Sequence, residues 1–130
     1  MTSGNENLEV KNIVNLSERL YTFALKIVLL VRKLPKELAS YEIGRQLVRS
    51  GTSIAANYEE AKGGFSRDDF IYKINTAFKE AKETNLWLKL LRDSNLSRED
   101  EIKWLIKESE EIQNILGASV KTAKNGKKHE

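Results

Sequence analysis

The chain has 130 residues and a formal net charge of +3; 40% of its residues are hydrophobic and 32% are charged, which fits a single folded domain. It has no cysteine, which excludes disulfides and cysteine-ligated metals and favours a reducing compartment. Residues 1–10 are polar and acidic, unlike a signal peptide. The longest apolar stretch, 27–31, is far shorter than the ~20 residues that a membrane span needs. We therefore expect a cytoplasmic protein without a membrane partner.

The first predicted element is a helix over residues 7–34. Its apolar residues recur at spacings of three and four, the period of one helix face. Further apolar residues widen this stripe, so the helix is expected to contact more than one neighbour. Pro35 should end it, because proline lacks an N–H and disfavours helical angles at Leu34. The stripe consists of Ile13, Leu16, Leu20, Phe23, Ile27, Leu30 and Leu34.

The second predicted helix covers residues 40–62 and contains unusually small residues. Glycine inside a helix costs about 1 kcal/mol relative to alanine, so Gly44 and Gly51 need a reason. Together with Ala55 they form one stripe, which favours close approach by another helix. Gly63 and Gly64 follow and are expected to end the helix, because glycine is free to take the left-handed conformation at a helix C-terminus. The inner seam is predicted to contain Ile43, Leu47, Ser50, Ile54, Asn57 and Ala61.

Two further helices are predicted over residues 66–93 and 97–123. Ser66 with Asp69, and Ser97 with Asp100, have the spacing of a helix N-terminal capping box. Residues 93–95 indicate a turn between the helices. The third seam is expected to contain Phe70, Ile74, Ala77, Phe78, Ala81, Thr84, Leu88 and Leu91, and the fourth Ile102, Leu105, Ser109, Ile112, Leu116 and Ser119.

The last residues, 121–130, are predicted to form a basic, frayed tail. Residues 118–130 hold four lysines and one glutamate, so 18 basic and 18 acidic residues remain for the rest of the chain. The body is therefore neutral, and the tail carries the whole excess charge. Such a terminus is more often solvated than functional.

Four helices with short connections favour an all-α fold, an antiparallel up-down four-helix bundle with long helices. No linker or internal repeat divides the sequence. We therefore expect one domain over residues 1–130.

The sequence offers no catalytic group, cofactor site or metal site. The only histidine, His129, is the penultimate residue, and di-iron bundles need Glu-x-x-His motifs, which are absent. Gly63-Gly64 lacks the lysine and the spacing of a phosphate-binding loop. An enzyme is therefore not expected.

Polar residues at helical spacing mark two helix edges. They are Ser53, Asn57 and Glu60 on the second helix, and Glu80, Thr84 and Trp87 on the third. One interpretation is a hydrogen-bond network between helices, because an unpaired buried polar group costs about 1–3 kcal/mol. The other is a polar pocket for a ligand. We favour the network.

Several residues would suit contact with nucleic acid. Three aromatic side chains could stack on bases, as in proteins that bind single-stranded nucleic acid: Trp87, Trp104 and Tyr58. Aromatic residues at helical spacing more often pack in a core or between subunits. The candidate phosphate contacts are Arg45, Arg49, Lys62, Arg67, Lys121, Lys124, Lys127 and Lys128. With so few cations, RNA binding is expected to be weak and steeply salt-dependent.

The run from Arg49 to Ala61 resembles a family signature. Arg49, Ser50, Ser53, Ile54, Asn57 and Glu60 match the Arg-Ser-x-x-Ser-Ile-x-x-Asn-x-x-Glu core of the bacterial four-helix-bundle family found in 23S ribosomal RNA intervening sequences. Residues 34–37, 66–70 and 79–88 are similar too, and the resemblance covers about residues 10–120. Departures are Ala55, where many members have proline, and Ala61, where many have glycine. Gly51, Glu80, Thr84 and Trp87 complete the family-motif and helix-contact residues.

The resemblance implies a homo-oligomeric ring, a homopentamer, of antiparallel bundles with an RNA or ribonucleoprotein partner. We therefore expect a non-enzymatic interaction scaffold. One alternative is a nucleic-acid-binding accessory subunit of a reverse transcriptase, because the accessory protein of diversity-generating retroelements has a related fold. Such accessory proteins tend to be much more basic than this chain. The other alternative is a small-molecule or metal-binding bundle.

Overall fold

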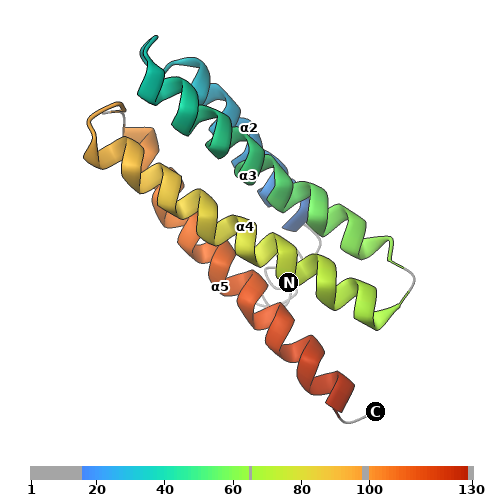
Figure 1. Ribbon diagram of the computed structural model, residues 1–130. Helices are drawn as coiled ribbons and strands as arrows, with labels where there is room; N and C mark the ends of the chain where they lie inside the picture. The colour runs from blue at the N-terminus through green and yellow to red at the C-terminus, as the bar shows by residue number, and fades with distance from the viewer. Residues whose placement is uncertain (1–15, 65, 98–99, 129–130) are drawn as a thin grey trace, which may run out of the picture.

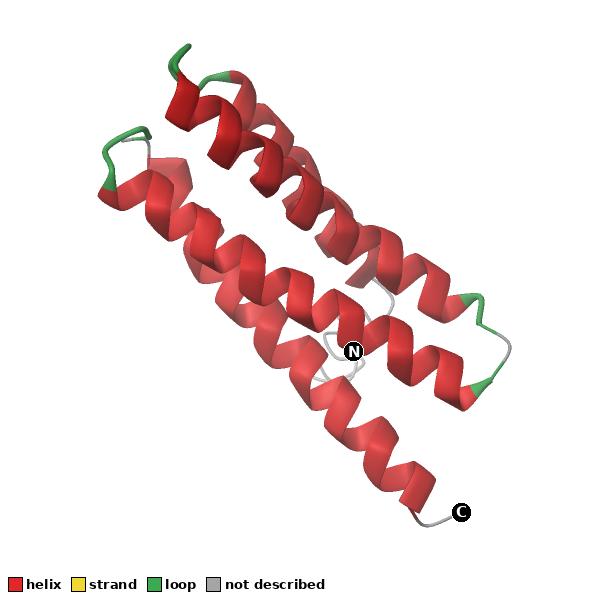
Figure 2. Cartoon of the chain, viewed as in Figure 1, coloured by secondary structure: helices red, strands yellow, loops and turns green. Residues whose placement is uncertain are grey.

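The computed structural model of the protein describes residues 16–64, 66–97 and 100–128. These residues form four α-helices and no strand (Figure 1 and Figure 2). The helices are α2 (Leu16–Arg32), α3 (Leu38–Lys62), α4 (Arg67–Asp93) and α5 (Asp100–Lys128). The predicted all-α, four-helix fold is confirmed. The segment 7–15 of the first predicted helix lies outside the described residues, as does His129.

Local signals explain where the helices begin and end. Ser66 caps α4, because its Oγ accepts a hydrogen bond from the backbone N–H of Asp69 at 3.1 Å, as the capping-box spacing predicts. α3 ends before Gly63 and Gly64, as predicted, but without the left-handed conformation: Gly63 has φ −91°. The N–H of Gly63 donates to the carbonyl of Glu59 at 3.3 Å, and the N–H of Gly64 donates to that of Ala61 at 3.2 Å. Among described non-glycine residues, Asn95, after α4, takes the positive φ, 60°.

The C-terminal part of the chain differs from the prediction. α5 continues to Lys128, where a frayed tail from residue 121 was expected. The physical reason is packing against α4. Val120 is buried in the core, and a Cβ added at Gly126 would lie 3.1 Å from Arg67 Nη1 in the first turn of α4.

Each helix contributes one apolar seam to a common core. α3 packs against α2 and α4, α5 packs against α4, and α2 makes its smallest contact with α5. Within the described ranges, no Cα atom of α2 lies within 8 Å of a Cα atom of α4, so these two helices lie diagonally in the bundle. The largest fully buried side chains are Leu20, Phe23, Ile27, Leu30, Leu47, Ile54, Ile74, Leu88, Leu91, Ile102, Leu105 and Ile112. All belong to the seams predicted from helical spacing.

The small residues of α3 lie where α2 comes closest. A Cβ added at Gly51 would be 3.1 Å from Ile27 Cγ2, and one at Gly44 would be 3.0 Å from Val31 Cγ1. Both distances are tighter than ordinary van der Waals contact. The absence of these side chains therefore lets the two helices approach.

The contacts between helices also show their register. Lys62, at the end of α3, donates to Ser17 Oγ at the start of α2, whereas Gly44, near the start of α3, faces Val31 at the end of α2. Likewise, Glu60 near the end of α3 pairs with Lys73 in the early part of α4. Over the described part of the chain, none of the four helices combines the length and the apolar character that crossing a bilayer requires.

Candidate interaction surfaces

An ion-pair cluster joins α3 to α4. Arg49 Nη1 lies 3.3 Å from Glu80 Oε2, Arg49 Nη2 binds Glu83 Oε1, and Trp87 Nε1 donates to Glu83 Oε1 at 3.2 Å. The hydrogen bond from Arg49 is the main cause that lowers the pKa of Glu83, and the same bond raises the pKa of Arg49. The charge of Arg49 is thus already matched by two carboxylates.

A buried hydroxyl pair lies next to this cluster. Ser50 Oγ and Thr84 Oγ1 are 2.9 Å apart, and Thr84 Oγ1 is also 2.7 Å from the carbonyl of Glu80. Because each hydroxyl has one proton, Ser50 can donate to Thr84 while Thr84 donates to that carbonyl. Glu80 and Thr84 therefore contact α3 directly, whereas Trp87 donates to Glu83, which in turn pairs with Arg49 of α3.

The other predicted polar edge does not gather into a single network. Asn57 Nδ2 donates to the backbone carbonyl of Ser53 at 2.8 Å, within the same helix. Glu60 instead reaches Lys73 of α4 at 3.4 Å. Asn57 and Ser53 are therefore bonded to each other within α3, whereas the partner of Glu60 lies on α4.

The inter-helix contacts that sequence reasoning missed include two buried or half-buried contacts with α5. Arg19 of α2 makes a two-pronged ion pair with Glu108 of α5, and Asn85 Nδ2 of α4 donates to Ser109 Oγ of α5 at 2.8 Å. Arg19 and Glu108 are 89 residues apart in the sequence. No local pattern signals such a pair.

The candidate nucleic-acid contacts do not form one surface. Arg45 and Arg49 lie in the first half of α3, toward the α2–α3 turn, whereas Arg67 lies at the start of α4, beside the C-terminal turns of α5 (Figure 1). Lys121, Lys124, Lys127 and Lys128 all belong to those turns. Lys62 pairs with Glu59 at 3.2 Å. The cations thus lie toward opposite ends of the bundle.

The proposed stacking residues also have contacts within the chain. Lys26 Nζ of α2 lies 4.0 Å from the ring centroid of the exposed Trp104, which is a cation–π contact. Lys62 Nζ lies 5.4 Å from the ring of the half-buried Tyr58. Trp87 is half-buried beside Glu83.

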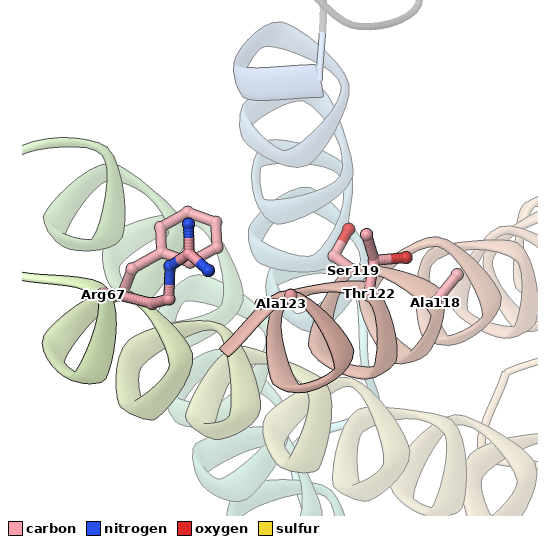
Figure 3. Close-up of a pocket in the computed structure, with 7 residues that line it drawn as sticks. Arg67, Ala118, Ser119, Thr122 and Ala123 are labelled. Atoms are coloured by element: carbon pink, nitrogen blue, oxygen red, sulfur yellow. The ribbon is translucent and has the colours of Figure 1, made fainter. Parts of the chain in front are cut away.

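A groove of about 650 Å³ lies between the start of α4 and the end of α5 (Figure 3). Arg67 and Phe70 of α4 face a stripe of small residues on α5. This stripe contains Ala118, Ser119, Thr122, Ala123 and Gly126. The groove has one cation and two hydroxyls.

A second groove, of about 620 Å³, lies at the α2–α3 turn. We call it the α2–α3 groove. Its lining residues are Val31, Arg32, Leu34, Pro35, Lys36, Ser40, Tyr41, Gly44, Arg45, Val48 and Arg49. It combines apolar side chains with four cations. Elsewhere, the described residues contain no group of three or more acidic or histidine side chains placed to hold a metal ion.

Two stripes of large apolar side chains face outward. On α2, Tyr21, Leu25 and Leu29 follow one another at spacings of four and are 38–66% exposed. On α4, Leu86 and Leu90 have the same spacing and are also exposed. We call these the α2 stripe and the α4 stripe.

Comparison with known proteins shows similarity both in sequence and in structure. Residues 12–118 match the family described as 23S rRNA-intervening sequence protein. The chain is also 38% identical to a protein of unknown function from the S23 ribosomal protein family of Bacteroides thetaiotaomicron, with a TM-score of 0.75. That match covers 81% of this chain and 97% of the other. No curated protein matches.

Proposed function

Because this chain belongs to the 23S rRNA-intervening sequence protein family, we propose that it is a non-enzymatic scaffold of antiparallel helices. It assembles into a homopentameric ring in the cytoplasm and takes an RNA or ribonucleoprotein as its partner. The matched family is not described as an enzyme family. The contacts that join the end of α3 to the starts of α2 and α4 support the antiparallel up-down arrangement.

The main observation that supports self-association is the pair of exposed apolar stripes. They lie on α2 and α4, the diagonal helices, and so on different sides of the bundle. A ring needs a head-to-tail interface, in which two different surfaces of one subunit meet their counterparts on its neighbours. Exposed apolar patches are typical of such interfaces. The α2 stripe of one copy would cover the α4 stripe of the next.

The RNA or ribonucleoprotein partner rests on the family description and on the cations at the two ends of the bundle. A ring would repeat each of these weakly basic ends around its axis. Repetition of weak sites raises the overall affinity for a long strand, because the second contact becomes intramolecular. The neutral body of each subunit is compatible with this arrangement.

We predict that replacing Leu25 and Leu29 with glutamate breaks the assembly. Both side chains are exposed in the single subunit, so the fold should tolerate the change, whereas buried carboxylates at an interface would be costly. Sedimentation of the unaltered chain at micromolar concentration should show the oligomer, and the double variant should sediment as a monomer. Leu38→Glu, at another exposed leucine, should leave the oligomer intact. A clean monomer for the unaltered chain would refute the ring.

RNA binding is predicted to be weak and steeply salt-dependent. It depends on a few lysines and arginines, whose contacts with phosphate release counterions. RNA should be recovered with the protein from its native host at low salt and lost at several times that ionic strength. Replacing the exposed Lys121 and Lys124 with alanine should reduce the slope of log affinity against log salt by about one to two units. Tight binding that persists at high salt would contradict this expectation.

A further inference from the structure

The α2–α3 groove is unusual in its charge. Four of its eleven lining residues are cations and none is an acid, although the described chain is rich in both. The groove lies where α2 ends and α3 begins, so its residues come from the last turn of α2, the connecting turn and α3 as far as Arg49.

The four cations differ in how far their charge is already matched. Arg32 and Lys36 are exposed and have no carboxylate partner among the described residues. Arg45 has one exposed partner, Glu42, at 3.0 Å, and such surface pairs contribute little. Arg49 is held by Glu80 and Glu83. Three cations are therefore available to an anion.

Ser40 gives a second, independent indication of a ligand. It is only 3% exposed, lines the groove, and its Oγ has no hydrogen-bond partner. Buried hydroxyls are normally paired, so an unpaired one calls for an explanation. Ser40 is also in the first turn of α3, where backbone N–H groups lack acceptors within the helix. The N-cap residue, Glu37, makes no side-chain hydrogen bond to them. An anion at this helix end would be favoured by the helix dipole.

The rest of the lining is apolar. Val31, Leu34, Pro35 and Val48 form walls that an inorganic anion would leave unused. Tyr41, 58% exposed, presents an aromatic ring to which a planar group could stack. The best-matched ligand is therefore an anion attached to a planar, partly apolar body.

We infer that the α2–α3 groove binds a nucleotide. Its phosphate contacts Arg32, Lys36 and Arg45 near Ser40, and its base packs on Tyr41 and the apolar walls. The phosphate comes from a free nucleotide or from the 5′-terminal nucleotide of a single-stranded RNA. The second source rests on the proposed RNA partner, and the first does not.

Titration calorimetry on the full chain tests this inference with three small probes: AMP, adenosine and inorganic phosphate. AMP should bind saturably, and each of the other two should bind at least about tenfold more weakly, because each lacks one half of the recognition. Equal binding of adenosine and AMP would overturn the phosphate site. Absence of saturable binding both by AMP and by a 5′-phosphorylated ten-nucleotide oligouridine would overturn the proposal altogether. Binding of the oligonucleotide alone, dependent on its 5′-phosphate, would support it and identify RNA as the source.

Matched variants place the site. In the double variant Arg32→Ala/Lys36→Ala, the affinity for AMP or for the oligonucleotide, whichever binds, should fall by about tenfold or more. The control variant Lys103→Ala/Lys107→Ala removes two exposed cations of α5 and should change that affinity by less than about twofold. Equal losses in both variants would overturn the groove as the site.

Ser40→Ala should raise the melting temperature of the free protein, because it removes an unpaired buried hydroxyl, and yet should weaken binding. A variant that binds as tightly as the unaltered chain would contradict the role of Ser40.

The oligomeric state of the Arg32/Lys36 variant separates this inference from the ring. These residues do not belong to either apolar stripe, so sedimentation should be unchanged. A protein that sediments as a monomer but still binds nucleotide would contradict the ring alone. An oligomer that binds no nucleotide would contradict the nucleotide site alone.

Discussion

Replacing Arg19 with methionine is expected to lower the free energy of unfolding by about 2–3 kcal/mol at neutral pH. Arg19 Nε donates to Glu108 Oε2 at 2.8 Å, and Arg19 Nη2 donates to Glu108 Oε1 at 2.7 Å. Glu108 is only 8% exposed, so removing the guanidinium leaves a buried carboxylate without its hydrogen-bonded cation, and the charge of Lys26 is the smaller influence that remains. The expected loss is below that of a fully buried pair, because the Arg19 side chain is 35% exposed. Urea denaturation measures it.

The loss should depend on pH in a defined direction. The hydrogen bond from Arg19 is the main cause that lowers the pKa of Glu108 below its usual 4.5, although burial acts in the opposite sense. A carboxyl whose pKa is lowered in the folded state contributes stability above its unfolded pKa, and that contribution is lost as the pH falls through the folded pKa. The difference between the variant and the unaltered chain should therefore be full at pH 7 and shrink at acid pH.

Glu111 provides the control for this ion pair. It also accepts from Arg19 Nη2, at 2.6 Å, but its side chain is 50% exposed. Glu111→Gln should cost less than about 1 kcal/mol, as exposed pairs do. Equal losses for Arg19→Met and Glu111→Gln would show that burial of Glu108 does not set the cost. The double variant Arg19→Met/Glu108→Leu should recover part of the loss, because two apolar side chains can replace a buried pair.

The second large effect is expected at Gly51, where α2 and α3 are closest. Gly51→Leu should destabilise the protein by about 3 kcal/mol, at the upper end of the range for overpacking. A single Cβ there would already be 3.1 and 3.2 Å from Cγ2 and Cγ1 of Ile27, which is fully buried. Gly51→Ala should be nearly neutral, because a shift of a few tenths of an ångström is offset by the better helix propensity of alanine. Chemical denaturation of both variants measures the contrast.

Ile27→Ala tests whether the clash is with this side chain. Alone it should cost about 2–5 kcal/mol, because it leaves a cavity in the core. Combined with Gly51→Leu it should cost less than the sum of the two single losses, because the leucine can occupy the vacated space. Strict additivity of the two changes would show that the leucine is excluded by something else.

Much of the fold was predictable because its signals are local. Helical spacing identified the buried seams, including Phe23, Ile27, Leu47 and Leu105, all fully buried. A helix at the surface of a bundle buries one face and leaves the opposite face to solvent, so the position of apolar residues along the chain reveals which face turns inward. Ser66 capped α4 as predicted, because a cap depends on residues three positions apart.

Predictions failed where one helix depends on another. The terminal lysines suggested a frayed tail, but α5 continues to Lys128. Its last turns lie beside Arg67 of α4, which approaches Gly126. Gly63 and Gly64 end α3 as predicted, but Gly63 has φ −91° and does not use the left-handed conformation that glycine permits.

The sequence by itself determined the number and type of the helices, their inward faces and the family, because periodicity, caps and a short motif are written within one or two helical turns. Only the tertiary structure decided which polar groups meet. It paired Arg19 with Glu108, 89 residues away. It also gave Asn57 and Glu60, which share one helix edge, different partners: Ser53 for Asn57 and Lys73 for Glu60. It also placed Arg45 and Arg67 toward different ends of the bundle, and it brought Arg32, Lys36 and the unpaired Ser40 to one groove. The physical reason is that a side-chain partner depends on the distance between helices after packing, and the spacing of residues along one helix does not contain that distance.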